Sequence, residues 1–184
     1  QANGMGGRQA RTDAAAVAEG NPVGSYGDIF DHHAVEFDYA DGAKLFSYCR
    51  HMKGCWNKTG WSAQGTRGSA GYGQDGTTVS ADGRPPEEFL RDKIDTHQTE
   101  HDHLFAALVA GQPYNEGDYG WKSTMTAILG RMATYSGKTV AWDDALNSNL
   151  DLSPAGYTWD SQPQPQPGKD GSYPIPVPGV TKAW

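Results

Sequence analysis

The sequence has few cysteines, no long hydrophobic run and no excess of positive charge, and each absence removes a class of protein. Its two cysteines, Cys49 and Cys55, are too few for a disulfide-rich scaffold and lack the spacing of a zinc site. No stretch of about 18 apolar residues occurs, so we expect no membrane-spanning helix. The net charge of −7 argues against binding to nucleic acid or to an anionic membrane surface.

The chain also lacks the glycine pattern of a dinucleotide-binding domain. The opening glycines, in "GMGGRQ", do not have the G-x-G-x-x-G spacing, and no strand pattern precedes them. The 184 residues suffice for one domain with a core, while 24 glycines and 11 prolines predict long irregular segments. Because the first residue is not methionine, we expect the sequence to be processed, trimmed or cut from a longer protein.

The clearest local pattern is a β-hairpin. The runs "AVEFDYA" and "AKLFSYC" are rich in aromatic residues, and they flank Asp41-Gly42, a pair typical of a type I′ turn. A two-residue turn at this point fixes which residues face each other. On one face, the predicted pairs are Val35 with Tyr48, Phe37 with Phe46, Tyr39 with Lys44 and His33 with Arg50.

Asp31, His32 and His33 are of the types that bind metal ions, but their spacing argues against a site. Side chains alternate between the faces of a strand, so adjacent histidines point in opposite directions and cannot bind one ion. A pair formed by His32 and His51 stays open, although it lacks a third ligand. We therefore predict no metal site, and we expect His33 and Arg50 to line a pocket at the edge of the sheet.

The rest of the chain divides into short strands, helices and a proline-rich tail. Turn-rich sequence predicts short strands over 62–70 and 77–81, with Gly65–Gly68 as a bulge or a close strand crossing. Apolar residues at helical spacing predict a helix from Thr96 that ends at Gly111. Two more helices are expected, over 119–136 and from Trp142 to about Asn147. Gly130, inside the second helix, suggests the close approach of another backbone.

Three segments follow from these patterns. Residues 1–27 are expected to be irregular, residues 28–150 to form a sheet domain, and residues 151–184 to be an extended tail on the surface of that domain. The tail contains "SQPQPQPGKDGSYPIPVPGV", in which proline alternates with other residues and excludes both helix and central strand.

Several segments together resemble the C-terminal domain of the Gfo/Idh/MocA oxidoreductases, in particular of their secreted-type bacterial branch. They are "GDIFDHHAVEFDYADGAKLFSYCR", "GTRG", "EHDHLFAALVAGQPYNEGDYGWKSTMTAILGRMATYSGKTVAWDDALNS", "LSP" and "VPGVTK". The resemblance covers nearly the whole chain, and the stretch from Glu100 to Ser148 carries most of it.

The resemblance implies an α+β fold with an open, largely antiparallel β-sheet and helices packed on one face, followed here by the extended proline-rich tail. It implies a homo-oligomer formed through the open sheet face. In a complete enzyme it implies an N-terminal Rossmann domain that binds NAD or NADP, and hydride transfer between the nicotinamide and a sugar or cyclitol hydroxyl. The branch implies a periplasmic or secreted protein, with the cytoplasm as the alternative.

The sequence departs from this family in its catalytic motifs. The Glu-Lys-Pro motif and the Asp-x-x-x-His helix of the family are absent, so we expect no catalytic, cofactor-binding or metal-binding residue in this chain. We expect the chain to be the downstream part of a longer enzyme, or the partner of one, with a Rossmann domain in cis or in trans.

The candidate substrate-binding residues lie at the end of the hairpin and in the loop before the second helix. They are His33, Arg50, Tyr114, Asn115 and Glu116. Arginine holds a carboxylate or sugar hydroxyls in a fixed fork, and histidine can donate or accept a hydrogen bond.

Three functions compete at this point. The first is the substrate-binding and assembly domain of an NAD(P)-dependent sugar oxidoreductase. The second is a non-catalytic module that uses the same sheet to bind carbohydrate or to assemble, with Trp56 and Trp61 stacking on sugars or simply packing. The third and weakest is a metal hydrolase that uses the histidines.

Overall fold

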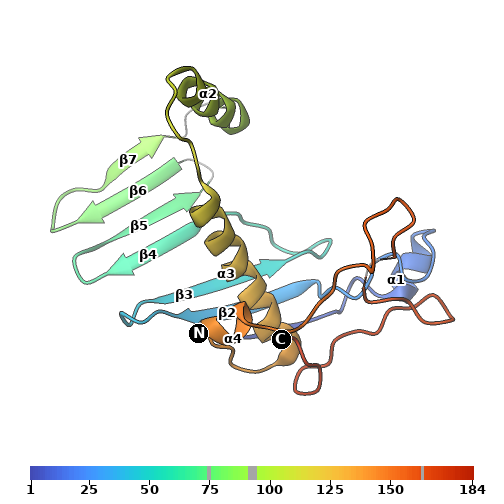
Figure 1. Cartoon of the computed structure of the whole chain (residues 1–184). Coiled ribbons are helices and arrows are strands. Elements are labelled where there is room, and N and C mark those ends of the chain that lie inside the picture. Colours follow the sequence, from blue (N-terminus) through green and yellow to red (C-terminus); the bar gives the residue numbers. More distant parts are fainter. Residues whose placement is uncertain (74–75, 91–94, 163) are drawn as a thin grey trace. The chain divides into compact units, whose positions relative to one another are not determined.

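A computed structural model describes residues 1–73, 76–90, 95–162 and 164–184 of the protein (Figure 1). The chain divides into two compact units. Unit 1 contains residues 1–53 and 116–184, and unit 2 contains residues 54–115. Residues 28–150, expected to form one sheet domain, therefore contribute to both units. The expected α+β class is confirmed, since both sheets are open and antiparallel and helices accompany them.

Unit 1 is built on a three-stranded antiparallel sheet, called sheet A, with the strand order β1-β2-β3. Its strands are β1 (Ala2–Gly7), β2 (His32–Asp38) and β3 (Lys44–Arg50). The expectation that residues 1–27 are irregular is wrong for β1 and for helix α1 (Asp13–Ala18). Glycine is a poor strand former, so the prediction failed where backbone pairing with β2 overrides local preference.

The loop between β2 and β3 has three residues, where the sequence predicted two. The Tyr39 N–H donates to the Ala43 carbonyl (3.0 Å), and the Gly42 N–H donates to the Tyr39 carbonyl (3.1 Å). Gly42 has a φ of +88°. A turn followed by a glycine in the left-handed region is the usual three-residue hairpin loop. The Asp41-Gly42 signal thus located the hairpin correctly but not its turn type.

The extra loop residue shifts the predicted register of the hairpin by one position. His33 lies opposite Cys49, and Arg50 lies opposite His32. A shift of one residue moves side chains to the other face of the partner strand. The prediction that His33 and Arg50 share a face is therefore wrong, as is the pairing of His32 with His51. The other pairs shift likewise: Ala34 with Tyr48, Val35 with Ser47, Glu36 with Phe46, Phe37 with Leu45 and Asp38 with Lys44.

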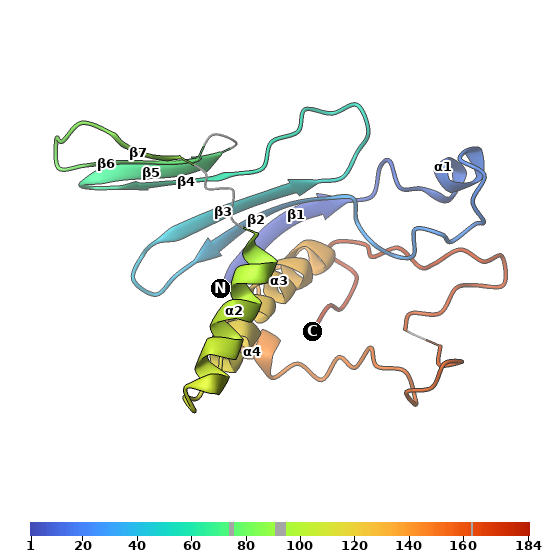
Figure 2. The ribbon, with the colours of Figure 1, turned by 90° about the horizontal axis from the view of Figure 1, so that it is seen from above.

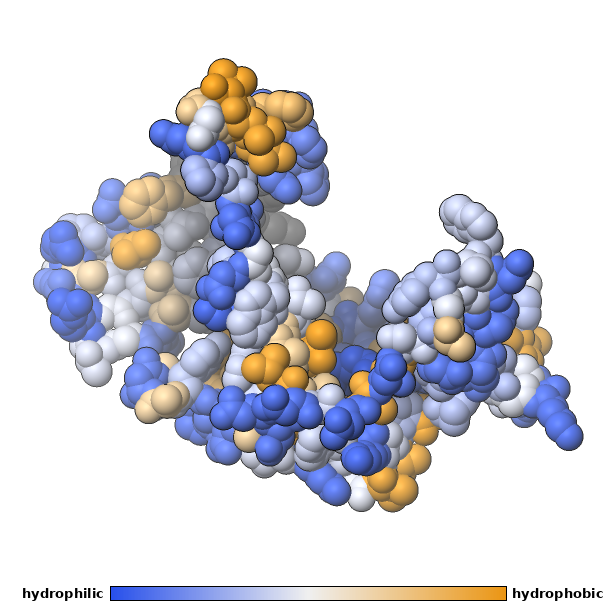
Figure 3. Space-filling view, in the orientation of Figure 1, coloured by the Kyte–Doolittle hydropathy of each residue, from blue (hydrophilic) through white to orange (hydrophobic). Residues whose placement is uncertain are grey.

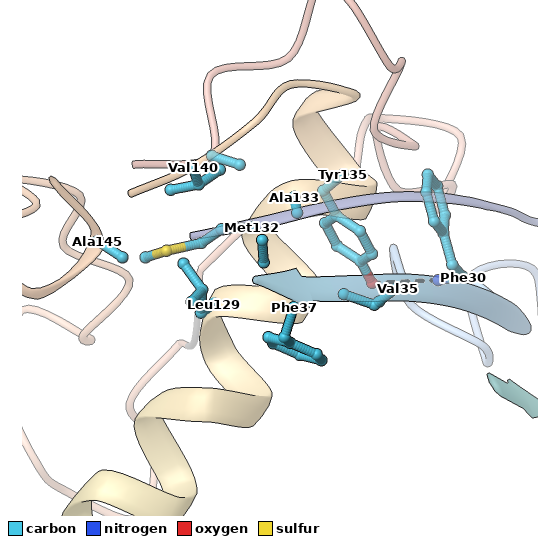
Figure 4. Packing of buried hydrophobic residues seen from close by; sticks show 11 residues of the cluster. Phe30, Val35, Phe37, Leu129, Met132, Ala133, Tyr135, Val140 and Ala145 are labelled. Carbon is cyan, nitrogen blue, oxygen red and sulfur yellow. Dashed lines mark hydrogen bonds between the residues drawn. The ribbon is translucent and has the colours of Figure 1, made fainter. Parts of the chain in front are cut away.

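Helix α3 (Gly117–Ser136) lies on one face of sheet A and closes the core of unit 1 (Figure 2). Its C-terminal half carries the buried side chains Leu129, Met132 and Tyr135, which pack against Val35 and Phe37 (Figure 4). Each large apolar side chain buried in this way contributes about 1.5–3 kcal/mol. The rest of this core comprises Ala2, Phe30, Ala133, Val140, Ala145 and Ala183.

Small residues allow the helix to approach the sheet closely. A Cβ atom added at Gly4 would lie 2.7 Å from the Ala34 carbonyl oxygen and 3.0 Å from Thr134 Cγ2. One added at Gly130 would lie 3.0 Å from the ring of Phe37. The neighbour of Gly130 is therefore an aromatic side chain, and the expected backbone contact is wrong.

The predicted helix boundaries are largely confirmed. Helix α3 ends at Ser136, before Gly137 with its φ of +67°, and α4 spans Trp142–Leu146. In α3, however, the apolar stripe is buried only in part, because Trp121 and Ile128 stay exposed.

The proline-rich tail runs along unit 1 in an extended form, as expected. No described residue of 151–184 lies in a helix or strand. The Gly179 N–H donates to the Ser136 carbonyl (2.6 Å), and Ala183 is buried in the core. Ile175 and Trp184 pack against the same core. The tail thus covers the end of α3 with its few apolar residues.

Unit 2 contains a four-stranded antiparallel sheet, called sheet B, with the order β4-β5-β6-β7. The strands are β4 (Trp61–Gly65), β5 (Gly68–Gly73), β6 (Gly76–Ala81) and β7 (Glu87–Leu90). The prediction of one strand over 62–70, with a bulge or crossing at Gly65–Gly68, is wrong. The chain turns at Thr66-Arg67, and Gly65 pairs with Gly68 across a tight hairpin.

Helix α2 (Thr96–Val109) also belongs to unit 2 and begins and ends as predicted. Asp95 caps its N-terminus by accepting the N–H groups of His97 and Gln98, and Gly111 has a φ of +67°. Its apolar side chains are exposed (Figure 3): Leu104, Phe105, Leu108 and Val109. Within the described residues, none of the helices has the length and apolar character needed to cross a membrane.

The close packing of α3 on Gly4 of β1 leads to a prediction about stability. Gly4→Val should lower the free energy of unfolding by about 1–3 kcal/mol, because the added side chain overfills the space under Thr134. Gly120→Ala is the control: no atom lies within 4 Å of its added Cβ, and alanine favours helix by about 0.5–1 kcal/mol. Urea denaturation measures both variants. Wild-type stability of Gly4→Val would contradict the close packing.

Candidate functional site

His33 lies on the face of sheet A that packs against α3. Its Nδ1 atom is 2.9 Å from Thr134 Oγ1, and its ring stacks on Tyr135 with 6.0 Å between the centroids. Burial, helped by the nearby charges of His32 and Arg131, lowers the pKa of His33 below its ordinary value. These contacts make His33 part of the packing between helix and sheet.

Arg50 lies on the other face of sheet A, opposite His32. Arg50 is exposed to solvent. The structure therefore separates the two candidates that the predicted register had brought together. Substrate contact by either residue stays a prediction.

Tyr114, Asn115 and Glu116 lie in the loop between α2 and α3, as expected. Glu116 is the N-cap residue of α3 and belongs to unit 1, whereas Tyr114 and Asn115 belong to unit 2. The loop is therefore shared between the units, and the proposed substrate contacts of its residues stay predictions.

The carboxylate of Asp31 takes part in four hydrogen bonds. Its Oδ2 atom accepts the backbone N–H groups of Gln9 (2.8 Å), Ala10 (2.6 Å) and Arg11 (2.9 Å). Its Oδ1 atom lies 2.8 Å from His32 Nδ1. Three successive N–H groups that converge on one oxygen form an anion-binding nest, and here the anion is a side chain of the same protein.

These hydrogen bonds keep Asp31 ionised although it is buried. Burial by itself raises the pKa of a carboxyl group, but the bonds from the backbone of Arg11, the ring of His32 and the backbone of Gln9 and Ala10 outweigh it. The pKa of Asp31 is therefore held far below its usual value.

The ionised carboxylate fixes the proton of His32. A carboxylate can only accept hydrogen bonds, so Nδ1 carries a proton, and in the neutral form of the ring Nε2 is the acceptor. The His32 side chain is 38% exposed, whereas that of Asp31 is 0% exposed. The pair is thus an oriented imidazole backed by a buried carboxylate, the arrangement that serves for proton transfer or for binding a hydroxyl group.

The backbone of Asp31 also joins the three strands at this end of sheet A. Its N–H donates to the Gly7 carbonyl (2.9 Å) at the end of β1, and its carbonyl accepts the His51 N–H (2.8 Å) just after β3. The Arg11 guanidinium donates to His51 Nδ1, which links the loop after β1 to the same place.

The segment before Asp31 is held by the core. The Phe30 N–H donates to the hydroxyl of Tyr135 (3.1 Å; dashed line in Figure 4). The ring of Phe30 packs against that of Tyr135 at 4.4 Å between the centroids. Helix α3 thereby fixes where β2 begins and where Asp31 lies.

The rings of His32 and His33 lie on opposite faces of the sheet, which confirms the alternation predicted from the sequence. Among the described residues, no three His, Cys, Asp or Glu side chains gather as metal ligands would. All strand pairs of the described sheets are antiparallel, so these sheets do not provide the strand–helix–strand unit that binds a dinucleotide.

Unit 2 presents a second candidate surface, a row of three aromatic side chains and one threonine across sheet B. Trp61 pairs with Tyr72, Tyr72 with Thr77 and Thr77 with Phe89, so all four lie side by side. A hollow of about 440 Å³ includes this row together with Lys58 and glycines 71, 73 and 76. Trp61 and Phe89 are half exposed. An aromatic floor with a few polar groups suits a small organic ligand.

No family model matches the chain, and no curated protein sequence matches it. Among solved structures, the chain is similar to aldose-aldose oxidoreductase from Caulobacter crescentus, crystallised in complex with glycerol. The TM-score is 0.56 and the sequence identity 18%, over 76% of this chain and 40% of that enzyme. The chain therefore spans less than half of the enzyme's length, and what the two share is a fold.

Sequence reasoning missed the pair of Asp31 and His32 as a unit. The partners of Asp31 in the loop at residues 9–11 lie about twenty positions upstream, in a stretch expected to be irregular. The only local signal was an aspartate directly before a histidine at the start of a predicted strand.

The hydrogen bonds of Asp31 predict how stability depends on pH. Asp31→Asn should lower the free energy of unfolding at pH 7 by about 2–4 kcal/mol, because an amide replaces a buried charge that accepts four hydrogen bonds. The folded-state pKa lies below the unfolded one, so this contribution is complete above about pH 4 and is lost as the pH falls further.

Denaturation of both proteins over a range of pH measures this difference, which should shrink below about pH 4. Asp160→Asn, at an exposed position of the tail, should leave the profile unchanged. A difference between wild type and Asp31→Asn that stays constant down to low pH would show that Asp31 is not the ionised anchor described above.

Proposed function

We propose that the chain is the substrate-binding and oligomerisation domain of an NAD(P)-dependent sugar or cyclitol oxidoreductase of the Gfo/Idh/MocA type. The observation that carries this proposal is the fold shared with part of aldose-aldose oxidoreductase over 76% of the chain. The sequence resemblance, which covers nearly the whole chain, points the same way. Alone, the chain is not expected to turn over a substrate.

The cofactor in this proposal is NAD or NADP, held by a Rossmann domain in cis or in trans. The described sheets do not fit a dinucleotide, because no parallel strand pair with a connecting helix is formed by them. The role of this chain would be to bind the sugar and to place its reacting carbon. The secreted-type resemblance supports a periplasmic or secreted location, with the cytoplasm as the alternative.

The exposed face of sheet A supports the second half of the proposal, assembly with a second copy. On the face away from α3, three large side chains lie exposed: Met5 (78%), Phe46 (54%) and Tyr48 (74%). Glu36, Asp38 and Lys44 form ion pairs on the same face, beside this apolar group. An apolar centre with a charged rim is the usual composition of a protein–protein interface.

The alternative function is a non-catalytic module that binds carbohydrate or assembles through the same sheets. The aromatic hollow of sheet B favours it, since such a surface can bind a sugar without any cofactor. A measurement of hydride transfer distinguishes the oxidoreductase domain from the non-catalytic module. The native protein, with its intact mass established, should reduce NAD⁺ or NADP⁺ with a sugar or cyclitol. A native protein that binds sugar, but neither contains nor associates with a dinucleotide domain, would favour the module.

The hollow of sheet B makes a prediction for sugar binding. Trp61→Ala should weaken the binding of D-glucose by about 2–10-fold, the loss expected when one aromatic stacking partner is removed. Trp159→Ala, at a fully exposed position of the tail, should bind as the wild type does. Isothermal titration calorimetry measures both variants. Equal binding by wild type and Trp61→Ala would exclude the hollow as the sugar site.

The exposed face of sheet A predicts an oligomer. Light scattering at micromolar concentration should give a dimer or larger for the wild type and a monomer for Tyr48→Asp, because a buried, unpaired charge at the interface is costly. Tyr157→Asp, on the exposed tail, should keep the wild-type mass. A monomeric wild type would rule out assembly through this face.

A further inference from the structure

Helix α4 and the end of the tail border a hollow that lies apart from the sites described above. Its volume is about 380 Å³. Asp143, Asp144 and Asn149 line it from α4 and the segment that follows, and Lys182 and Trp184 line it from the tail. All of these residues belong to unit 1. The volume lies within the range of about 300–1,000 Å³ that is usual for small-molecule sites.

The core of unit 1 holds both walls of this hollow in place. Ala145 of α4 (Figure 4) and Ala183 of the tail are each only 4% exposed and belong to the same core cluster. Just before α4, Val140 exchanges backbone hydrogen bonds of 2.9 and 2.8 Å with Ala2 of β1. Trp184 packs against the core as well. Both walls are therefore built on the core, and the hollow between them does not depend on the position of a free loop.

The charged groups around the hollow have no partner in the protein. Within the described part of the chain, the carboxylates of Asp143 and Asp144 and the ammonium group of Lys182 form neither hydrogen bonds nor ion pairs. The side-chain amide of Asn149 is also without a partner there. Groups of opposite charge thus line one hollow without pairing, and all of them can bind a molecule that enters it.

The chemistry of the lining indicates which molecule fits. Two carboxylates and one ammonium group leave a net negative charge, and the whole chain has a net charge of −7, so a cation is favoured. A carboxylate only accepts hydrogen bonds and an ammonium group only donates them, whereas a hydroxyl group does both. The indole of Trp184 adds a flat apolar surface on which a ring can stack.

We propose that this hollow binds an amino sugar with one positive charge. Its ammonium group would lie on Asp143 and Asp144, a hydroxyl group on Lys182, and the apolar face of its ring on Trp184. The inference goes beyond the proposed function, because it adds a second site that uses none of the residues assigned to substrate binding or assembly. It requires neither a cofactor nor unit 2.

Three ligands separate the contribution of the charge from that of the ring. D-Glucosamine carries both, D-glucose has a hydroxyl group in place of the amine, and methylamine carries the ammonium group alone. Calorimetry on the native protein at about pH 6, where such amines are protonated, should show D-glucosamine binding at least about tenfold more tightly than either of the others. In NMR spectra, D-glucosamine should shift the indole N–H signal of Trp184 and leave that of the exposed Trp159 in place.

Matched variants test each wall. Asp143→Asn combined with Asp144→Asn keeps the shape of the hollow but removes its negative charge. The affinity for D-glucosamine should then fall by about tenfold or more, to the level of D-glucose, while D-glucose binds as before. Trp184→Leu keeps an apolar side chain against the core but loses the ring, so both sugars should bind about 2–10-fold more weakly.

Asp160→Asn and Trp159→Ala, at exposed positions of the tail, are the controls and should bind as the wild type does. Thermal unfolding of each variant establishes that unit 1 is folded. Equal affinity for the three ligands, or wild-type affinity for D-glucosamine in the folded double variant, would overturn the inference. Because these measurements contain no NAD(P) and change no residue of the proposed oxidoreductase domain, that result would leave the proposed function standing.

Conversely, selective binding of D-glucosamine by a native protein that shows no hydride transfer would support this site and count against the proposed function.

Discussion

The hydrogen bonds of the buried residue Asp31 are the interactions on which one end of sheet A depends. Its backbone joins the ends of β1 and β3 through Gly7 and His51, and its side chain binds the loop at residues 9–11. A single residue thus holds the ends of the three strands and the adjoining loop together where the regular hydrogen bonds between the strands stop. The same carboxylate fixes the ring of His32. One side chain therefore both holds the end of the sheet together and orients an imidazole on its surface.

Helix α3 supplies the other half of this arrangement. It can lie close to sheet A because β1 presents Ala2, Gly4 and Gly6 on the facing side. Its Tyr135 then reaches the segment before Asp31 and holds the Phe30 N–H. Packing in the core therefore decides where the polar groups on the opposite face of the sheet come to lie.

Local signals in the sequence predicted the elements but not the pairings between them. Helices α2, α3 and α4 follow from apolar spacing and glycine ends, and the hairpin follows from Asp41-Gly42. The register of the hairpin could not be predicted from this signal, because the same Asp-Gly pair fits both a two-residue and a three-residue loop. The choice of loop decides whether Arg50 lies opposite His33, as predicted, or opposite His32, as observed. β1 was missed because its stability comes from a partner strand and a helix far along the chain. The contacts of Asp31 were invisible for the same reason.

The most direct test of this account is the tautomer of His32, read from the ¹⁵N chemical shifts of its ring at neutral pH. The account requires a proton on Nδ1, with Asp31 as the partner that holds it, so the neutral ring must be the Nδ1–H tautomer. Asp31→Asn should lose this preference, because an amide can also donate to the ring. A wild-type ring with its proton on Nε2, or one that averages freely between both forms, would contradict the central claim that the buried carboxylate orients His32.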